Sequence, residues 1–448
     1  MRNAIIFILI IMAIRVAVAW FYPLLPDEAY YWVWSRELAA GYFDHPPMVA
    51  WLVRVGTLIL GNSHIGVRLF FIILSAGTGF LTYLLIKELS DERLGFQGLL
   101  VGTGILLLGI GGLLAVPDVP LIFFWTLGLY AGIRAIRKPA WWLIYGIALG
   151  AAMLSKYSGV FLLTIPLAYI FTRRGFLASG FWWMGMALAV LILLPNIIWN
   201  AGHGWVSFAY QAGHGLGRPW DLFGPVKYIM DAALVNSLLP FIFLIWGIIR
   251  TGRKLMETSR FALMLSLFVP FILFWIASAR GPAEANWPAP AYTSLVILGT
   301  IGLGKLTEKW PWKAVVGFGI GLVGLVYAQA VYPFMRIKGD PTEAARGWQE
   351  LALCVHTVME THTGVAIAAP RYQEASELSF YLPGNPPVRV ANPRGRPNQI
   401  TLSHPAEPGE SFIFVGEPEG FLETSLIIEC EGRRHYNIYL AKGYLCTH

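Results

Sequence analysis

Long apolar segments alternate with short polar ones over residues 1–334 of the chain. A helix needs about 20 mostly apolar residues to cross the hydrocarbon core of a bilayer, so each long segment is a candidate membrane span. The pattern predicts about eleven spans. They lie at residues 4–22, 66–86, 96–115, 119–136, 140–155, 158–172, 176–198, 226–249, 261–279, 288–304 and 314–334. The apolar segment 48–60 is too short to span and carries Arg54, so we expect an interfacial helix there.

The pattern changes to a soluble one from residue 335 onward. Short apolar runs at GVAIAA, SFIFVG and SLIIEC, separated by Pro- and Gly-rich turns, predict strands, and the spacing of apolar residues over 342–361 predicts an amphipathic helix. We therefore expect a membrane domain over residues 1–334, with an outer loop at 23–65, and a small α/β domain over residues 335–448.

The three cysteines, Cys354, Cys430 and Cys446, all lie in the expected α/β domain. In an oxidising compartment one pair could form a disulfide. The odd number leaves open the alternative that all three are buried thiols.

Composition supports the membrane assignment. Hydrophobic residues make up 56% of the chain and charged residues 13%, with a mean hydropathy of +0.59, whereas soluble proteins average about 25% charged residues. The net charge of +7 comes from Lys and Arg in short loops between apolar segments, which is typical of topology signals and excludes a nucleic-acid surface.

The distribution of Lys and Arg also predicts an orientation. These residues concentrate in alternate loops, at 87–93, 134–138, 173–174, 250–260 and 305–313. Because positive loops stay on the cytoplasmic side, we expect a cytoplasmic N-terminus in the plasma (inner) membrane, with the outer loop and the α/β domain extracytoplasmic.

Unusual polar residues gather in segments predicted to lie outside. Charges at a membrane boundary are costly to desolvate and tend to face a wet cavity or a partner, so we expect one shared site. The residues are Asp27, Glu28, Asp44 and His45 in the outer loop, Asp118 in AVPDVPL, Lys156 in LSKYSG, Asn200, His203, His214 and Arg218 in segment 196–221, and Arg280, Glu284 and Asn286 in SARGPAEANWPAPAY.

Several of these segments together resemble a known family. PDEAYYW and FDHPP in the outer loop, PDVPL, SKYSG, NIIWN and EANWPAPAY are similar to the bacterial branch of the protein O-mannosyltransferase and aminoarabinose-transferase (ArnT-like) group. The resemblance implies a polytopic α-helical GT-C glycosyltransferase that takes its sugar from a polyprenyl-phosphate carrier. The chain lacks the large inserted lumenal domain of the eukaryotic mannosyltransferases, which favours a lipid or glycan acceptor over a protein.

The resemblance assigns roles to the acidic residues. Asp27 matches the family's acidic residue at the end of the first span and is expected to be the general base, with Glu28 as the second candidate. The alternative for Glu28 is a solvated or helix N-terminal carboxylate. Asp118 falls on a motif position and is expected to bind substrate, although an aspartate there is also a good helix N-cap.

The cations are expected to stabilise the leaving phosphate. Lys156 and Arg280 are placed near it with Arg218 behind them, and Glu284 and Asn286 are expected to bind substrate. Arg15 lies inside the first span, where it would pair with an acidic neighbour or extend to the interface, and is left out of the site.

The turn at His45 departs from the family pattern. Aminoarabinose transferases usually have Lys before Pro-Pro, whereas this chain has Asp44 and His45, which puts aminoarabinose in doubt as the donor sugar. His45 could hold the phosphate when protonated, bind a divalent metal with Asp44 or His203, or be a hydrogen-bonded structural residue.

The main alternative function is that of a transporter or flippase for a lipid-linked or small anionic substrate. Such proteins more often show related halves and charges deep within spans. Here no repeat is visible, the acidic residues lie in outer loops, and a sizeable outer domain follows. The sequence also lacks a glycine-rich phosphate loop, so no nucleotide is expected. Glycine-rich stretches such as VGTGILLLGIGG and VGFGIGLVGL are expected to pack helices together.

Overall fold

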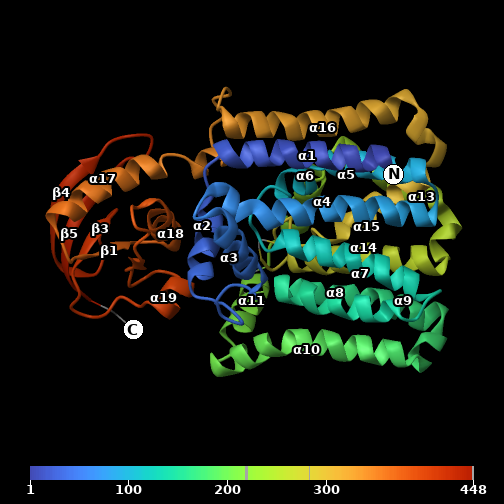
Figure 1. Ribbon diagram of the computed structural model, residues 1–448, viewed down its shortest axis with the longest axis horizontal. Helices are drawn as coiled ribbons and strands as arrows, with labels where there is room; N and C mark the ends of the chain where they lie inside the picture. Colours follow the sequence, from blue (N-terminus) through green and yellow to red (C-terminus); the bar gives the residue numbers. More distant parts are fainter. Residues whose placement is uncertain (217–219, 282, 446–448) are drawn as a thin grey trace. The chain divides into compact units, whose positions relative to one another are not determined.

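The computed structural model describes residues 1–216, 220–281 and 283–445 (Figure 1). The chain divides into two compact units. The first consists of residues 1–18, 45–49 and 68–328, and the second combines residues 19–44 and 50–67 with residues 329–448. The loop that follows the first helix therefore belongs to the same unit as the C-terminal sheet.

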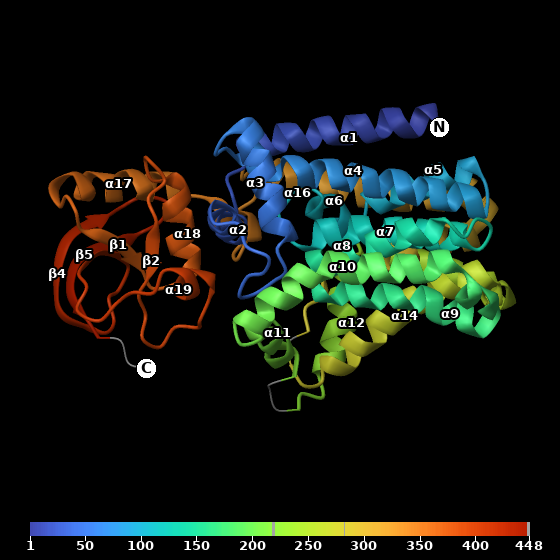
Figure 2. The same ribbon diagram turned by 60° about the horizontal axis from the view of Figure 1, so that its bottom comes forward.

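The first unit is helical, and most of its long helices run alongside one another in both views (Figures 1 and 2). Its α-helices are α1 (Arg2–Phe21), α4 (His64–Leu89), α5 (Glu92–Thr103), α6 (Leu106–Gly111), α7 (Asp118–Ala135), α8 (Trp141–Ser155), α9 (Thr164–Thr172), α10 (Gly180–Gly202), α11 (Val206–Leu216), α12 (Gly224–Val235), α13 (Leu239–Thr251), α14 (Thr258–Ala277), α15 (Ala291–Leu303) and α16 (Trp310–Val331). Short 3-10 helices are η1 (Tyr157–Leu163), η2 (Arg174–Ala178), η3 (Gly252–Met256) and η4 (Gly304–Glu308).

Among the described residues, five helices are long and apolar enough to cross a membrane: α1, α4, α10, α14 and α16. A sixth span results if α12 and the helical stretch after it, which are bent by 102°, count as one. Helical structure occupies each of the eleven expected segments, although those at 96–115 and 226–249 are broken. The chain is a multi-pass membrane protein of mostly helical architecture, as the sequence predicts.

The two broken segments meet at their breaks. The Ser237 hydroxyl, at the start of the α12–α13 bend, donates to the Gly104 carbonyl at 2.8 Å and accepts from the Leu106 amide at 3.0 Å. Backbone groups freed by a helix break are costly to leave unpaired in a membrane protein. The buried Ser237 side chain thus bonds both the Gly104 carbonyl and the Leu106 amide at the break between α5 and α6.

Glycines allow close packing of the membrane helices. A Cβ built on Gly319 of α16 would lie 2.6 Å from the Gly104 carbonyl oxygen, so neither position tolerates a side chain without movement. These residues belong to the two glycine-rich stretches that the sequence assigns to helix packing, and the prediction holds for Gly104 and Gly319. Gly317, Gly321 and Gly324 of the second stretch have nothing within 4 Å of an added Cβ.

Both expectations for Arg15 are wrong. Its side chain is buried rather than extended outward, and within the described residues it forms no ion pair with a carboxylate. The guanidinium donates to Ser75 Oγ at 2.6 Å, Tyr327 Oη at 3.2 Å and the Leu108 and Gly109 carbonyls at 3.3 and 2.9 Å. A planar guanidinium with five donors can satisfy several neutral oxygens at once. Arg15 therefore ties α1, α4 and α16 to the C-terminal turn of α6.

The second unit contains the first loop and a mixed α/β structure. Its helices are α2 (Pro26–Arg36), α3 (Met48–Leu60), which begins in the first unit, η5 (Pro341–Ala345), α17 (Trp348–Thr361), α18 (Tyr372–Tyr381) and α19 (Gln399–Ser403). Its strands are β1 (Ala366–Ala369), β2 (Val388–Val390), β3 (Phe412–Val415), β4 (Phe421–Cys430) and β5 (Tyr436–Tyr444). The expected helix at 48–60, the amphipathic helix and all three expected strands are present.

The five strands form one sheet in the order β2-β1-β3-β5-β4. β1 pairs in parallel with β2 and β3, while β5 pairs antiparallel with β3 and β4. Phe412, Phe414 and Tyr444 form part of the core beneath the sheet. α17 is amphipathic: it buries Trp348, Leu351, Val355 and Val358, whereas Leu353 is exposed.

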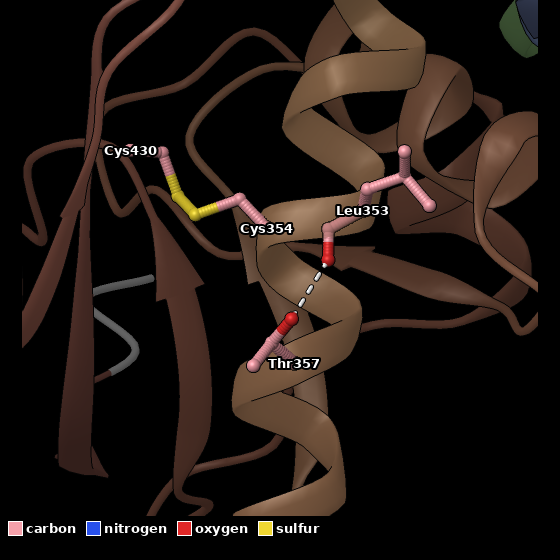
Figure 3. The surroundings of a disulfide bond; sticks show 4 residues. All are labelled: Leu353, Cys354, Thr357 and Cys430. Atoms are coloured by element: carbon pink, nitrogen blue, oxygen red, sulfur yellow. Dashed lines mark hydrogen bonds between the residues drawn. A yellow bond between two sulfur atoms is a disulfide. The ribbon is translucent and has the colours of Figure 1, made fainter.

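A disulfide links Cys354 on α17 to Cys430 at the end of β4, across 76 residues of chain (Figure 3). In the same helix, Thr357 Oγ1 donates to the Leu353 carbonyl at 3.2 Å (Figure 3). The alternative of three unpaired thiols is therefore wrong. Cys446 lies outside the described residues.

Candidate functional site

The expected site residues fall into two groups, one in each unit. Asp27, Glu28 and Asp44 lie in the second unit, where C-terminal side chains surround them. The first unit holds His45, Asp118, Lys156, Arg280, Glu284 and Asn286. Arg218 lies outside the described residues.

Two adjacent carboxylates at the start of α2 have different environments. Pro26 occupies the first helical position, which its fixed φ suits. Glu28 is fully buried and accepts a hydrogen bond from the Leu25 amide at 3.0 Å, so it satisfies a backbone donor at the helix start. Asp27 is exposed. It accepts a hydrogen bond from Tyr372 Oη at 3.4 Å.

Asp44 is buried and surrounded by polar partners. It accepts a hydrogen bond from Tyr30 Oη at 2.7 Å and forms an ion pair with Arg396 at 3.1 Å. Burial raises the pKa of the Asp44 carboxyl above its usual value, and the nearby charge of Asp27 adds to this, while Arg396 and Tyr30 act in the opposite direction. The guanidinium of Arg396 therefore lies against the buried carboxylate of Asp44, in the same loop segment, residues 19–44, that carries Asp27.

A chain of hydrogen bonds extends from Asp44 into α19. The Gln399 amide donates to Tyr30 Oη at 2.6 Å, and the Gln399 side-chain oxygen accepts from the Phe43 amide at 2.8 Å. Burial and the charge of Asp44 hold the pKa of Tyr30 well above its usual value, so its hydroxyl remains a donor. Sequence reasoning missed Arg396, Gln399 and Tyr372. The basic run PRGRPNQ was a signal for Arg396, but nothing in the sequence links it to Asp44.

In the first unit, Asp118 and Lys156 form an ion pair, with Nζ and Oδ1 2.9 Å apart and side-chain exposures of 16% and 13%. Asp118 is the first residue of α7, and the N-cap position before it is occupied by Pro117. Lys156 stands in extended conformation between α8 and η1. The capping alternative for Asp118 is therefore wrong, and the structure brings together two of the expected substrate-binding residues.

A buried polar cluster follows Lys156 in the chain. Tyr157 Oη lies 3.2 Å from Asn196 Oδ1 and 2.9 Å from Ser207 Oγ, and it accepts from Asn200 Nδ2 at 3.2 Å. Asn196 and Asn200 are fully buried on α10. The SKYSG and NIIWN motifs therefore meet in this cluster.

Two of the expected histidines, His45 and His203, have hydrogen-bonding partners, and the side chain of His214 lies outside the described part of the structure. Gln211 Nε2 lies 3.4 Å from His45 Nδ1. The His203 ring stacks on Trp199 with centroids 4.1 Å apart, and its Nδ1 bonds to the Trp199 carbonyl at 2.8 Å. In the described part of the chain, no group of three or more His, Cys, Asp or Glu side chains is arranged to hold a metal ion.

The remaining expected residues lie before α15 and are not joined to the ion pair by any described contact. Arg280 is exposed, and its guanidinium lies 5.4 Å from the centroid of the Trp220 ring, a cation–π contact. Glu284 is exposed and Asn286 is partly exposed.

The chain is similar to proteins whose names describe sugar transfer. Residues 44–199 match the family described as dolichyl-phosphate-mannose-protein mannosyltransferase. This range includes Asp44, Asp118 and Lys156 but not Asp27.

Two curated relatives resemble more of the chain. Lipid A galacturonosyltransferase RgtD of Rhizobium johnstonii is 29% identical over 309 residues, covering 64% of this chain and 61% of that protein. Undecaprenyl phosphate-alpha-4-amino-4-deoxy-L-arabinose arabinosyl transferase of Edwardsiella ictaluri is 25% identical over 357 residues, covering 70% and 62%. The matched part thus spans less than two thirds of these relatives.

A solved structure matches almost the whole chain. The crystal structure of ArnT from Cupriavidus metallidurans bound to undecaprenyl phosphate superposes with a TM-score of 0.72, covers 97% of both chains and is 14% identical. At this identity the likeness establishes the fold.

Proposed function

We propose that this chain, an ArnT-like protein with the GT-C fold, is an inverting glycosyltransferase. It moves a monosaccharide from a polyprenyl-phosphate carrier to a hydroxyl or phosphate of an extracytoplasmic acceptor, a lipid or glycan of the cell envelope. The names of the two relatives described above, both transferases, support this reading over a transporter.

The observation that carries the proposal is the difference between Asp27 and Glu28. A general base must reach the acceptor, and Asp27 is exposed whereas Glu28 is buried and bonded to the backbone. Asp27 also lies six residues after the end of α1, in the first turn of α2, where a water-soluble acceptor would meet a lipid-borne donor.

The proposed reaction is a single displacement. Asp27 takes the proton of the acceptor hydroxyl, the acceptor oxygen bonds to the anomeric carbon, and the bond between that carbon and the phosphate oxygen breaks. The polyprenyl phosphate leaves with the bonding electrons. Lys156 and Arg280 would stabilise the developing phosphate charge, with Asp118 holding Lys156 in place.

We further propose an N-terminus inside and a C-terminus outside, with membrane and α/β domains over residues 1–334 and 335–448. The disulfide between Cys354 and Cys430 supports this orientation, because structural disulfides persist in oxidising compartments. A reporter active only outside the cytoplasm, fused to the C-terminus, is expected to be active. A fusion that is active only with a cytoplasmic reporter would contradict the orientation.

The activity is tested with purified protein, an envelope glycolipid fraction as acceptor, and either polyprenyl-phosphate or nucleotide sugars as donor. We expect transfer from the polyprenyl-phosphate sugar alone. Asp27→Asn is expected to keep the fold and lower turnover about 100-fold. The matched control is Glu423→Gln, which changes an exposed carboxylate of β4. Near-normal turnover by folded Asp27→Asn protein would remove Asp27 as the base, and turnover of nucleotide sugar alone would remove the proposed donor class.

A further inference from the structure

The contacts around Asp27 extend into the C-terminal domain. We propose that Tyr372 is a positioning residue for the carboxylate of Asp27, and that the Arg396–Asp44 pair holds the Tyr372 ring in place. This inference rests on the proposed function, because it takes Asp27 as the general base.

Tyr372 reaches Asp27 because two helices pack together. Tyr372 is the first residue of α18, and Asp27 lies in the first turn of α2. The two helices are in contact, with Trp32 against Phe380 at 5.1 Å between ring centroids. Tyr372 Oη donates to Asp27 Oδ1 at 3.4 Å. A hydrogen bond donated to a carboxylate favours its charged form, which is the form that a base needs.

The Tyr372 ring is held between two groups of this same unit. Its centroid lies 4.4 Å from that of Tyr30, and the Arg396 guanidinium lies 5.3 Å from it. Arg396 also pairs with Asp44, which accepts from Tyr30 Oη. The carboxylate, the guanidinium and the two rings therefore fix one another. Loss of any of them frees the Tyr372 ring.

The start of α18 is anchored independently. Arg371, which precedes Tyr372, pairs with the buried carboxylate of Glu374, with Nε and Oε1 2.8 Å apart. Tyr436 of β5 also donates to Glu374 Oε1 at 3.4 Å. The first turn of α18 is thus tied to the sheet, and the hydroxyl of Tyr372 is presented from a rigid element.

These contacts give the C-terminal domain a role in the reaction. It supplies the hydroxyl that bonds the proposed base and the guanidinium that neutralises the neighbouring carboxylate. This accounts for the division of the chain, in which residues 19–44 form a unit with residues 329–448.

The first test compares Tyr372→Phe with Tyr439→Phe, a matched loss of a hydroxyl that bonds the exposed Glu417. We expect Tyr372→Phe to lower kcat about tenfold with little change in KM, and Tyr439→Phe to change neither. Without the donated hydrogen bond the charged form of the Asp27 carboxylate is less favoured, so we expect the acid limb of the pH–rate profile to move to higher pH. The other titratable and charged groups facing this site are Asp44, Tyr30 and Arg396, so the same profile is measured for Asp44→Asn. An unmoved profile in Tyr372→Phe overturns the inference.

A double variant tests whether Tyr372 acts through Asp27. In Asp27→Asn protein, adding Tyr372→Phe is expected to cause less than a twofold further loss of turnover. If the two losses multiply, Tyr372 acts independently of Asp27 and the inference is wrong.

A measurement without turnover separates this inference from the proposed function. Tyrosine labelled with ¹³C at Cζ gives a Tyr372 resonance that is assigned by its loss in Tyr372→Phe. Its shift is expected to follow an acidic titration that disappears in Asp27→Asn. If the wild type transfers no sugar, the proposed function fails whatever this titration shows. If the acidic titration of the Tyr372 resonance persists in Asp27→Asn, the positioning contact is wrong even in an active enzyme.

Discussion

Arg396 of the C-terminal domain and Asp44 of the first loop form an ion pair with Nη2 and Oδ1 3.1 Å apart. The carboxylate is buried, whereas the arginine side chain is 41% exposed. A buried carboxylate needs such a partner, because an unpaired buried charge is costly. The pair joins two segments that are far apart in the sequence and places a cation over the ring of Tyr372, whose hydroxyl bonds the proposed base.

Stability of the second unit is predicted to depend on the protonation of Asp44. Because burial raises the pKa of Asp44, the folded state binds a proton more readily than the unfolded state does. The stabilisation by this proton is fully present below the unfolded pKa and is lost as pH rises through the folded pKa. We expect the unfolding temperature to fall across this acidic window in wild type and less in Asp44→Asn.

Replacing Arg396 is predicted to widen the pH range over which stability falls. Arg396→Gln removes a group that lowers the pKa of Asp44, so the loss of stability is expected to continue to higher pH than in wild type. Arg394→Gln, in the same exposed loop, is the control and should match wild type. Thermal unfolding of the intact protein in detergent at several pH values measures the stability of both arginine variants. Identical curves for the two arginine variants would rule out coupling to Asp44.

The ion pair of Asp118 and Lys156 is predicted to contribute to both stability and transfer. Lys156→Met leaves a largely buried carboxylate without its cation, so we expect about 3 kcal/mol of destabilisation. The double variant Asp118→Asn/Lys156→Met should recover most of this stability. If the lysine also binds phosphate, turnover will stay low in the double variant. Recovery of both stability and turnover in the double variant would show that the ion pair has a structural role and no role in transfer.

The disulfide is predicted to stabilise the C-terminal domain by about 4 kcal/mol, because it closes a long loop in the unfolded chain. The bridge spans 76 residues. Cys354→Ser should lower the unfolding temperature, and a reductant should lower that of the wild type to the same value. A reductant should have no effect on Cys354→Ser. Wild-type unfolding that is insensitive to reductant would contradict the bridge.

The contact of Arg15 with α6 is predicted to exclude a side chain at Gly112. A Cβ there would lie 2.1 Å from Ser75 Oγ and 2.7 Å from Arg15 Cζ, so Gly112→Ala is expected to cost about 2 kcal/mol. Gly111→Ala is the matched control, since nothing lies within 4 Å of its added Cβ. Unfolding of the two variants in detergent gives the comparison. Equal stability of the two variants would mean that the site relaxes freely.

The sequence by itself determined the membrane helices, the helix at 48–60, three of the five strands of the sheet and the family resemblance. These features depend on local properties, because the length and period of apolar residues are read within one segment. The glycine-rich stretches were assigned to packing for the same reason, since their small side chains have few other uses in a span.

The tertiary structure decided which distant groups meet. An aspartate at the start of a helix has the same sequence signature whether it caps the helix or pairs with a lysine, so Asp118 required its contact with Lys156 to be interpreted. Arg15 likewise met carbonyl oxygens that only a helix break exposes. The partners of Asp27 and Asp44 come from the other end of the chain, and no local pattern specifies them because such contacts depend on how the helices and sheet pack.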